Sequence, residues 1–203
     1  MSATARADSP RVRAWASGRP GLVAAGAIVA ALMLAGPSAG ATHDAVRAPA
    51  EVAGALPAAR LQGSGALRFL GLLVYEARLW TTAEFTPERY DAHTFALELR
   101  YARRLEGAAI AERSIAEMRR IGTFDQTRAR AWLDQLIRAL PDVNPGDRLT
   151  GVRGPDGVSR FYSNGQPTLS IADPEFGRLF FGIWLSNNTS EPALRRELIG
   201  QIR

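Results

Sequence analysis

The chain of 203 residues contains no cysteine and no lysine, and its only histidines are His43 and His93. Without cysteine it cannot form disulfides, use a thiol nucleophile or hold zinc or an iron–sulfur cluster through thiolates. A Ser-His-Asp site or a histidine metal site would have to be built around a single histidine. His43 lies in a predicted linker and His93 just before a predicted strand, which favours surface positions for both. We therefore expect no metal, no cofactor and no catalytic residue of these classes.

The charge balance does not indicate a nucleic-acid partner. The formal net charge is +5, but four of the 25 basic and one of the 20 acidic residues lie within residues 1–41. The remainder of the chain therefore carries a net charge of only +2. Proteins that bind nucleic acid usually show a larger and more clustered basic excess.

Residues 1–41 have the pattern of a secretory signal peptide. Arginines come first, an apolar run of 16 residues follows at Gly21–Gly36, and Ala39-Gly40-Ala41 provides small residues for cleavage. We predict a cut after Ala41 and a periplasmic or secreted protein. The alternative is an uncleaved N-terminal anchor, although the run is shorter than the roughly 20 residues of a membrane span. The only membrane contact predicted is through this leader, if it stays uncleaved.

The remainder divides into a predicted linker, residues 42–58, and a folded domain, residues 59–203. Strands are predicted at Leu67–Trp80, interrupted at Gly71, and at Thr94–Tyr101, where apolar and polar residues alternate. Two helices should follow, the second opened by a capping box at Thr123. Turn signals then separate three short strands, which are Arg148–Arg153, Val158–Ser163 and Gln166–Ile171.

The chain should end with two more helices. Asp173 followed by proline is a typical start for the first, and Thr189 or Ser190 would cap the second. Runs of strands that are separate from runs of helices indicate an α+β fold, with helices packed on one face of a mainly antiparallel sheet.

Several blocks of the chain form a recognisable series in order and spacing: Gly63–Trp80, Leu97–Tyr101, Ile110-Ala111-x-x-Ser114, Pro145-Gly146-Asp147, Asp173–Phe176 and Phe181–Leu185. This series resembles chalcone isomerase-like proteins of bacteria, and in particular their exported members. Together they span about Leu61 to the C-terminus. The resemblance implies an open-faced β-sandwich, a large antiparallel sheet layered with helices. It also implies a family that includes both isomerases and fatty-acid-binding proteins, so fold alone does not decide the function.

The resemblance further implies which residues a chalcone isomerase would need. Its guanidinium is matched by Arg68, but the ketone-polarising threonine falls at Leu70, and the tyrosine and asparagine fall at Gly107 and Ser114. Leu70 and Gly107 cannot donate a side-chain hydrogen bond. Because such donors stabilise the developing oxyanion, their loss argues against isomerase activity.

Five residues are the candidate ligand-binding residues: Arg68, Tyr75, Tyr101, Arg104 and Arg113. Arg68 lies between apolar residues, and a buried guanidinium needs a partner or a ligand. A guanidinium binds a carboxylate through two hydrogen bonds, and a tyrosine hydroxyl can donate a further one. The alternative is that the arginines form surface ion pairs, such as Arg113 with Glu117, and that the tyrosines pack in the core.

Three hypotheses follow. The first is a non-catalytic exported protein that binds a small apolar ligand, such as a fatty acid, between sheet and helices. The second is an intramolecular lyase or isomerase that acts on an enone. The third is a cell-envelope interaction module without a ligand. An aliphatic cavity next to Arg68 would favour the first hypothesis, and a filled interior with Arg68 paired to a carboxylate would favour the third.

Overall fold

The computed structural model describes residues 46–201. The predicted signal peptide and its cleavage site lie outside the described residues. The elements in chain order are α1 (Ala50–Ala55), β1 (Arg60–Phe69), β2 (Leu72–Thr81), the 3-10 helix η1 (Pro87–Ala92), β3 (Phe95–Tyr101), α2 (Gly107–Ile121), α3 (Gln126–Ala139), β4 (Arg148–Arg153), β5 (Ser159–Ser163), β6 (Gln166–Ile171), α4 (Pro174–Leu185) and α5 (Pro192–Leu198).

The six strands form one antiparallel sheet in which every strand lies beside its neighbours in sequence, in the order β1-β2-β3-β4-β5-β6. Two hairpins have a two-residue turn with positive φ at both positions, Leu70-Gly71 between β1 and β2 and Asn164-Gly165 between β5 and β6. Such turns match the right-handed twist of paired strands. The sheet and its helices confirm the predicted α+β, open-faced sandwich.

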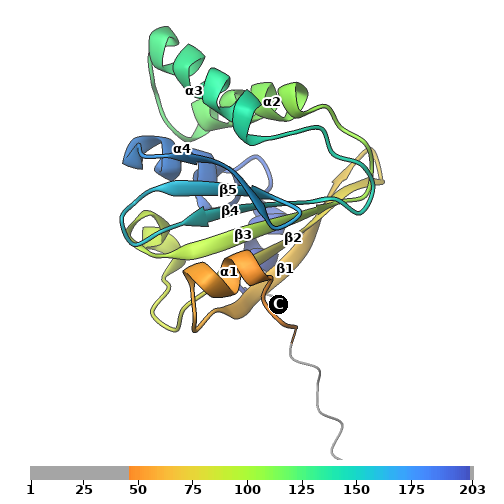
Figure 1. Ribbon diagram of the computed structural model, residues 1–203, viewed down its shortest axis with the longest axis vertical. Coiled ribbons are helices and arrows are strands. Elements are labelled where there is room, and N and C mark those ends of the chain that lie inside the picture. The colour runs from red at the N-terminus through yellow and green to blue at the C-terminus, as the bar shows by residue number, and fades with distance from the viewer. Residues whose placement is uncertain (1–45, 202–203) are drawn as a thin grey trace, which may run out of the picture. The chain divides into compact units, whose positions relative to one another are not determined.

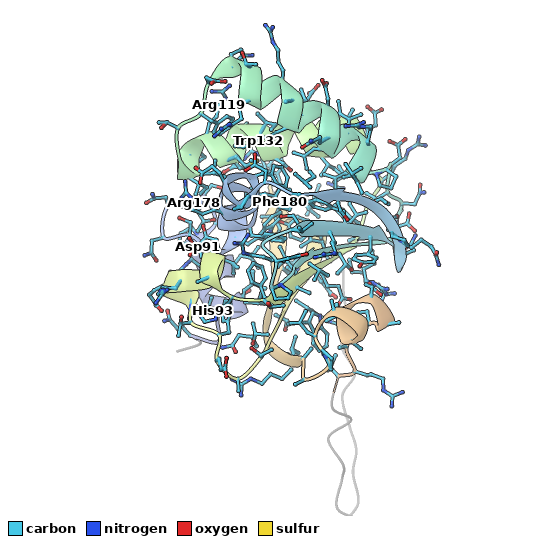
Figure 2. The ribbon with its side chains drawn as sticks, turned by 60° about the vertical axis from the view of Figure 1, so that its left-hand side comes forward. Asp91, His93, Arg119, Trp132, Arg178 and Phe180 are labelled. Carbon is cyan, nitrogen blue, oxygen red and sulfur yellow. The ribbon has the colours of Figure 1, made fainter. Side chains whose placement is uncertain are left out.

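The inner face of the sheet is covered by helices (Figure 1). Helix α4 contributes Phe176, Phe180 and Phe181, whose rings contact Phe161 and Phe95 on the sheet at centroid distances of 4.9 to 6.2 Å. Trp132 of α3 contacts Phe176 of α4 at a centroid distance of 5.7 Å, and Figure 2 shows Trp132 and Phe180 on these two helices. Helix α2 packs against both α4 and α3. This aromatic cluster is the centre of the core and fixes α4 against the strands.

The outer face carries α1, within the segment predicted as a linker. Val52 and Leu56 of α1 are almost fully buried and pack with Trp80, Ala96 and Val152 of the sheet. The expectation of a linker over residues 42–58 is therefore wrong for Ala50–Ala55. The segment is too short and too rich in alanine for its period to be visible in the sequence.

Buried polar side chains lie beneath α1 on this outer face. Glu51 accepts hydrogen bonds from Arg148 at 2.9 Å and from the Thr150 hydroxyl at 2.9 Å. Glu98 accepts one from the Trp80 indole at 2.9 Å. The alternation in β3 predicted Glu98 on a solvent-exposed face, but Glu98 is buried, with 4% of its surface exposed. The outer face is thus a second core, with its charges paired.

The helix starts agree with the sequence in one case and differ in two. Asp173 caps α4 as predicted, since its carboxylate accepts from the backbone N–H groups of Glu175 and Phe176. The cap of α3 is Asp125 and not the predicted Thr123, and Glu191 precedes α5 in place of Thr189 or Ser190. No helix in residues 46–201 combines the length and apolarity needed to cross a membrane.

Candidate ligand-binding site

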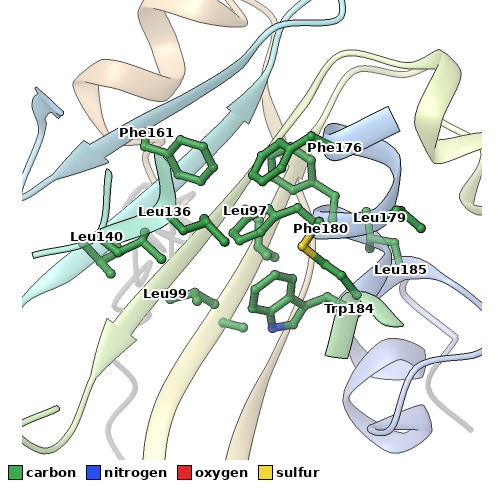
Figure 3. Packing of buried hydrophobic residues seen from close by; sticks show 14 of the residues in the cluster. Leu97, Leu99, Leu136, Leu140, Phe161, Phe176, Leu179, Phe180, Trp184 and Leu185 are labelled. Carbon is green, nitrogen blue, oxygen red and sulfur yellow. The ribbon is translucent and has the colours of Figure 1, made fainter. Parts of the chain in front are cut away.

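A cavity of about 270 Å³ lies between the inner face of the sheet and the helices, beside the aromatic cluster. Aliphatic and aromatic side chains form most of its wall; among them are Leu67, Val74, Leu97, Leu99, Leu105, Ile110, Leu140, Leu149, Phe161, Phe180, Phe181, Ile183 and Trp184. Figure 3 shows Leu97, Leu99, Phe180 and Trp184 facing one another across this region. Its volume lies just below the range of about 300–1,000 Å³ that is usual for ligand sites.

Two tyrosines from neighbouring strands bring hydroxyl groups to the cavity. Tyr75 of β2 and Tyr101 of β3 are paired across the two strands, and their rings meet edge to face at 5.7 Å. The Tyr75 oxygen accepts a hydrogen bond from the Trp184 indole N–H at 3.0 Å, so its own proton remains free to donate. Within residues 46–201, the Tyr101 hydroxyl has no side-chain hydrogen-bond partner. The cavity therefore contains two hydroxyl protons available to a ligand.

Burial keeps both hydroxyl groups protonated. Loss of hydration raises the pKa of Tyr75 well above its ordinary value of 10.0, and the bond from Trp184 offsets part of this rise. Burial also raises the pKa of Tyr101, and the neighbouring Tyr75 adds to the effect. Each hydroxyl is thus a neutral hydrogen-bond donor over the whole physiological pH range.

Charged side chains line the cavity where it meets solvent. Arg113 of α2 forms an ion pair with Glu117 at 2.6 Å, and Arg120 approaches the same carboxylate at 3.5 Å. The Arg113 side chain is 74% exposed, whereas that of Glu117 is only 10% exposed. Glu191, from the loop before α5, also lines this mouth. An acidic ligand that reached the mouth would compete with Glu117 for the Arg113 guanidinium.

The structure brings together three of the five candidate residues. Tyr75, Tyr101 and Arg113 line the cavity, whereas Arg68 and Arg104 do not. The alternative expectation, in which Arg113 pairs with Glu117, is confirmed. Arg113 also lines the cavity, so the ion pair does not exclude contact with a ligand.

The prediction of a buried Arg68 is wrong. Its side chain is exposed, and its guanidinium donates only a 3.4 Å hydrogen bond to the Gly71 carbonyl. The register of β1 on β2 shifts between Leu67 and Arg68, and the end of this hairpin extends past β3. Neither face of that end is covered, so apolar neighbours in sequence do not bury the arginine. Arg104 is exposed for a similar reason, since it lies in the loop after β3.

The positions that align with the hydrogen-bond donors of chalcone isomerases provide few such donors in this structure. Gly107 is buried, and a Cβ atom there would collide with the Leu140 carbonyl, so no larger residue fits. Ser114 lines the cavity, but its hydroxyl donates to the Ile110 carbonyl of its own helix at 2.8 Å. In the described part of the chain no cluster of acidic or histidine side chains could hold a metal ion. The site is suited to binding a small apolar molecule with one polar end.

The antiparallel sheet and the layer of helices together define an open-faced α+β sandwich, with an apolar cavity between the two layers. Residues 42–200 match the model of the chalcone isomerase-like family, and the chain belongs to this family. Among solved structures, a fatty-acid binding protein of Arabidopsis thaliana superimposes with a TM-score of 0.56 at 11% identity, covering 71% of this chain and 88% of that one. At this identity the likeness concerns the fold. No curated protein matches the chain in sequence.

Sequence reasoning missed the group around Tyr75. Trp184 is buried in the core, and its indole N–H also fixes the Tyr75 hydroxyl. Glu191 was not considered as a cavity residue. These two residues follow Tyr75 by more than 100 positions, and no local pattern joins them.

Proposed function

We propose that this protein binds a small apolar carboxylic acid, such as a short or medium-chain fatty acid, without converting it. The observation that carries the proposal is the apolar cavity with two buried, neutral tyrosine hydroxyls at one end. An apolar tail gains free energy from leaving water, at about 25 cal/mol per Å² of buried surface. The fatty-acid binding of the Arabidopsis protein with this fold supports the same choice of ligand.

The polar groups suggest how the ligand would lie. Its tail would contact Leu97, Leu99 and Phe161, and its carboxylate would accept hydrogen bonds from Tyr75 and Tyr101. Arg113, near the same end, would contact the carboxylate only by exchanging its partner Glu117 for the ligand, and Glu117 and Glu191 would repel the acid there. This arrangement replaces Arg68, the residue first expected to pair with the acid, by neutral donors. A cavity of about 270 Å³ would accommodate a short tail in full or a longer one in part.

The alternative function is an intramolecular lyase or isomerase that acts on an enone. The observation that favours it is the pair of hydroxyls, since two donors on one carbonyl oxygen would stabilise an enolate. Against it, among residues 46–201 the only guanidinium that lines the cavity is that of Arg113, which lies at the mouth, and Arg68 is outside. The absorbance of a chalcone incubated with the protein distinguishes the two functions. We expect no decrease above the uncatalysed rate.

We also propose that the protein acts in the periplasm or is secreted. The support is the leader pattern of residues 1–41 and the absence of cysteine, which leaves nothing for an oxidising compartment to modify at thiols. N-terminal sequencing of the protein purified from its own host should begin at Thr42. A chain that begins at Met1 would contradict cleavage.

Native mass spectrometry of the protein from its own host tests the binding proposal. We expect a population whose excess mass is that of an organic acid, released when the protein unfolds. If nothing is bound, a panel of fatty and phenolic acids should still raise the melting temperature, because binding to the folded state stabilises it. Absence of both a bound acid and any thermal shift would overturn the proposal.

A further inference from the structure

The tip of the β1–β2 hairpin exposes three large apolar side chains. Phe69 is 66%, Leu70 86% and Leu72 54% exposed. They are three of the five large hydrophobic residues that are exposed in the described part of the chain, and they lie within four consecutive positions. Single exposed apolar residues are common, but a group of this kind usually marks an interaction site.

The backbone conformation of the turn does not explain why position 70 is a leucine. Leu70 and Gly71 have φ values of 50° and 78°, and Asn164 and Gly165 in the β5–β6 turn have almost the same values, 50° and 84°. Asparagine is one of the few non-glycine residues that tolerate this left-handed conformation, and leucine is disfavoured in it. Leu70 therefore occupies a position where both its backbone and its exposure are unfavourable in the isolated protein.

The hairpin also projects from the sheet. Its last pair is Phe69 with Leu72, whereas the pairing of β2 with β3 ends at Tyr75 with Tyr101. The tip therefore has no hydrogen bonds to β3. It forms the projecting end of the β1–β2 ribbon at the right of Figure 1. The apolar side chains stand clear of the remaining surface.

Arg68 adjoins the tip, and a loop with two further arginines lies beside the same hairpin. Arg68 and Arg104 are exposed and Arg103 is half-buried, and none of them belongs to an ion pair within residues 46–201. The loop that carries Arg103 and Arg104 is held beside the hairpin by a 2.9 Å bond from the Ala102 N–H to the Val74 carbonyl. The nearest carboxylates in sequence are Glu106, two residues after Arg104, and Glu76, which is exposed on β2 four residues after Leu72. These three arginines, Arg68, Arg103 and Arg104, are called the collar below. An apolar tip with basic residues beside it is complementary to a surface of anionic lipid.

We propose that this tip docks the protein on an anionic bilayer, with Phe69, Leu70 and Leu72 entering the boundary between headgroups and acyl chains. The arginines of the collar would contact lipid phosphates. A bilayer is favoured over a protein partner because one turn presents far less than the roughly 800 Å² per partner of a standard protein interface. Leu67 and Val74, the adjoining hairpin residues, line the cavity, so docking would bring the cavity to the membrane. The docking proposal does not depend on which ligand the cavity holds.

Sedimentation with vesicles of phosphatidylcholine, with and without phosphatidylglycerol, tests the proposal. The mature chain, residues 42–203, should bind the anionic vesicles and be released by salt; the leader is left out because its apolar run would itself bind lipid. The variant with Phe69→Ser and Leu70→Asn should lose at least about tenfold in partitioning, because its apolar anchor is gone. Leu70→Asn suits the turn, so the fold should survive. Arg68→Gln and Arg104→Gln should each weaken binding by roughly fivefold.

Two matched variants provide controls on α3. Ile137→Gln removes another exposed apolar side chain, and Arg130→Gln another exposed arginine, and both should bind as the parent does. The proposal is overturned if no vesicle binds, if zwitterionic vesicles bind equally well, or if the tip variants bind like the parent. Self-association in sedimentation velocity that is lost in the tip variant, without vesicle binding, would make the tip a protein interface instead. Fatty-acid binding in solution should be unchanged in the tip variants, so the two proposals can fail separately.

Discussion

The two faces of the sheet differ in how completely they are filled. On the outer face, a single short helix covers apolar side chains together with two carboxylates, Glu51 and Glu98, that are paired to cations or indole N–H groups. On the inner face, four helices cover an aromatic cluster but leave a cavity with the Tyr101 hydroxyl unpartnered within residues 46–201. One carboxylate oxygen of Glu51 also lacks a partner on the outer face, so unpartnered polar atoms do not distinguish the two faces. The cavity does distinguish them, and it locates binding on the inner face and stability on both.

The largest expected effect is alkaline destabilisation through the inner face. Burial raises the pKa of Tyr90 to about 12, and those of Tyr75 and Tyr101 rise further, from 10.0 in each case. The folded state therefore holds these protons more tightly than the unfolded state. Stability should be fully present below pH 10 and fall above it, by about 1.4 kcal/mol per pH unit for each tyrosine. Urea unfolding between pH 8 and about 11 measures this slope.

The double variant Tyr75→Phe with Tyr101→Phe is the control for that slope. It should retain the contribution of Tyr90 alone, so that the decline becomes about one third as steep. An unchanged slope would mean that other groups titrate and that the two cavity hydroxyls are not held protonated by burial.

On the outer face, Glu51→Ala should lower the free energy of unfolding by about 2–3 kcal/mol. The change removes a buried carboxylate and leaves Arg148 and the Thr150 hydroxyl without their partner. The estimate is at the low end for a buried pair because the Arg148 side chain is 28% exposed. The matched variant Glu175→Ala breaks a surface pair with Arg178 and should cost less than about 1 kcal/mol. Equal losses would show that α1 is not part of the core.

A smaller effect separates the two tyrosines. Tyr75→Phe leaves the buried Trp184 N–H unsatisfied and should cost about 1–2 kcal/mol of stability. Tyr101→Phe removes a hydroxyl with no partner among the described residues and should change stability by less than about 0.5 kcal/mol. Both should weaken acid binding. Thermal unfolding together with calorimetric titration gives both quantities, and a large stability loss for Tyr101→Phe would contradict the free hydroxyl.

The fold could be predicted well from the sequence because its signals are local. Alternation in Thr94–Tyr101, the Asn164-Gly165 turn and the Asp173-Pro174 cap each depend on adjacent residues, and each appears in the structure. Gly63 and Gly65 were noted as part of the family resemblance, and the structure explains both. A Cβ atom at either would collide with Glu197 of α5.

The site could be predicted only in part. The alternation in Thr94–Tyr101 placed Tyr101 on the apolar face of its strand, and Tyr101 lines the cavity together with Tyr75, its partner on β2. The predicted burial of Arg68 was wrong because it was inferred from apolar neighbours in sequence. How far the hairpin extends past β3 depends on the tertiary structure and is not visible in the sequence. Helix α1 was missed because its burial depends on the outer sheet face, which a period of two in β3 assigned to solvent.

The most direct test of the central claim is to fill the cavity without disturbing its walls. Ser114 lines the cavity and bonds only within its own helix, so Ser114→Leu adds bulk there, while Ser114→Ala is the matched change without bulk. Calorimetric titration with a medium-chain fatty acid should give parent-like affinity for Ser114→Ala and a loss of at least about tenfold for Ser114→Leu, with both variants folded. Equal affinity in the two variants would contradict binding in this cavity.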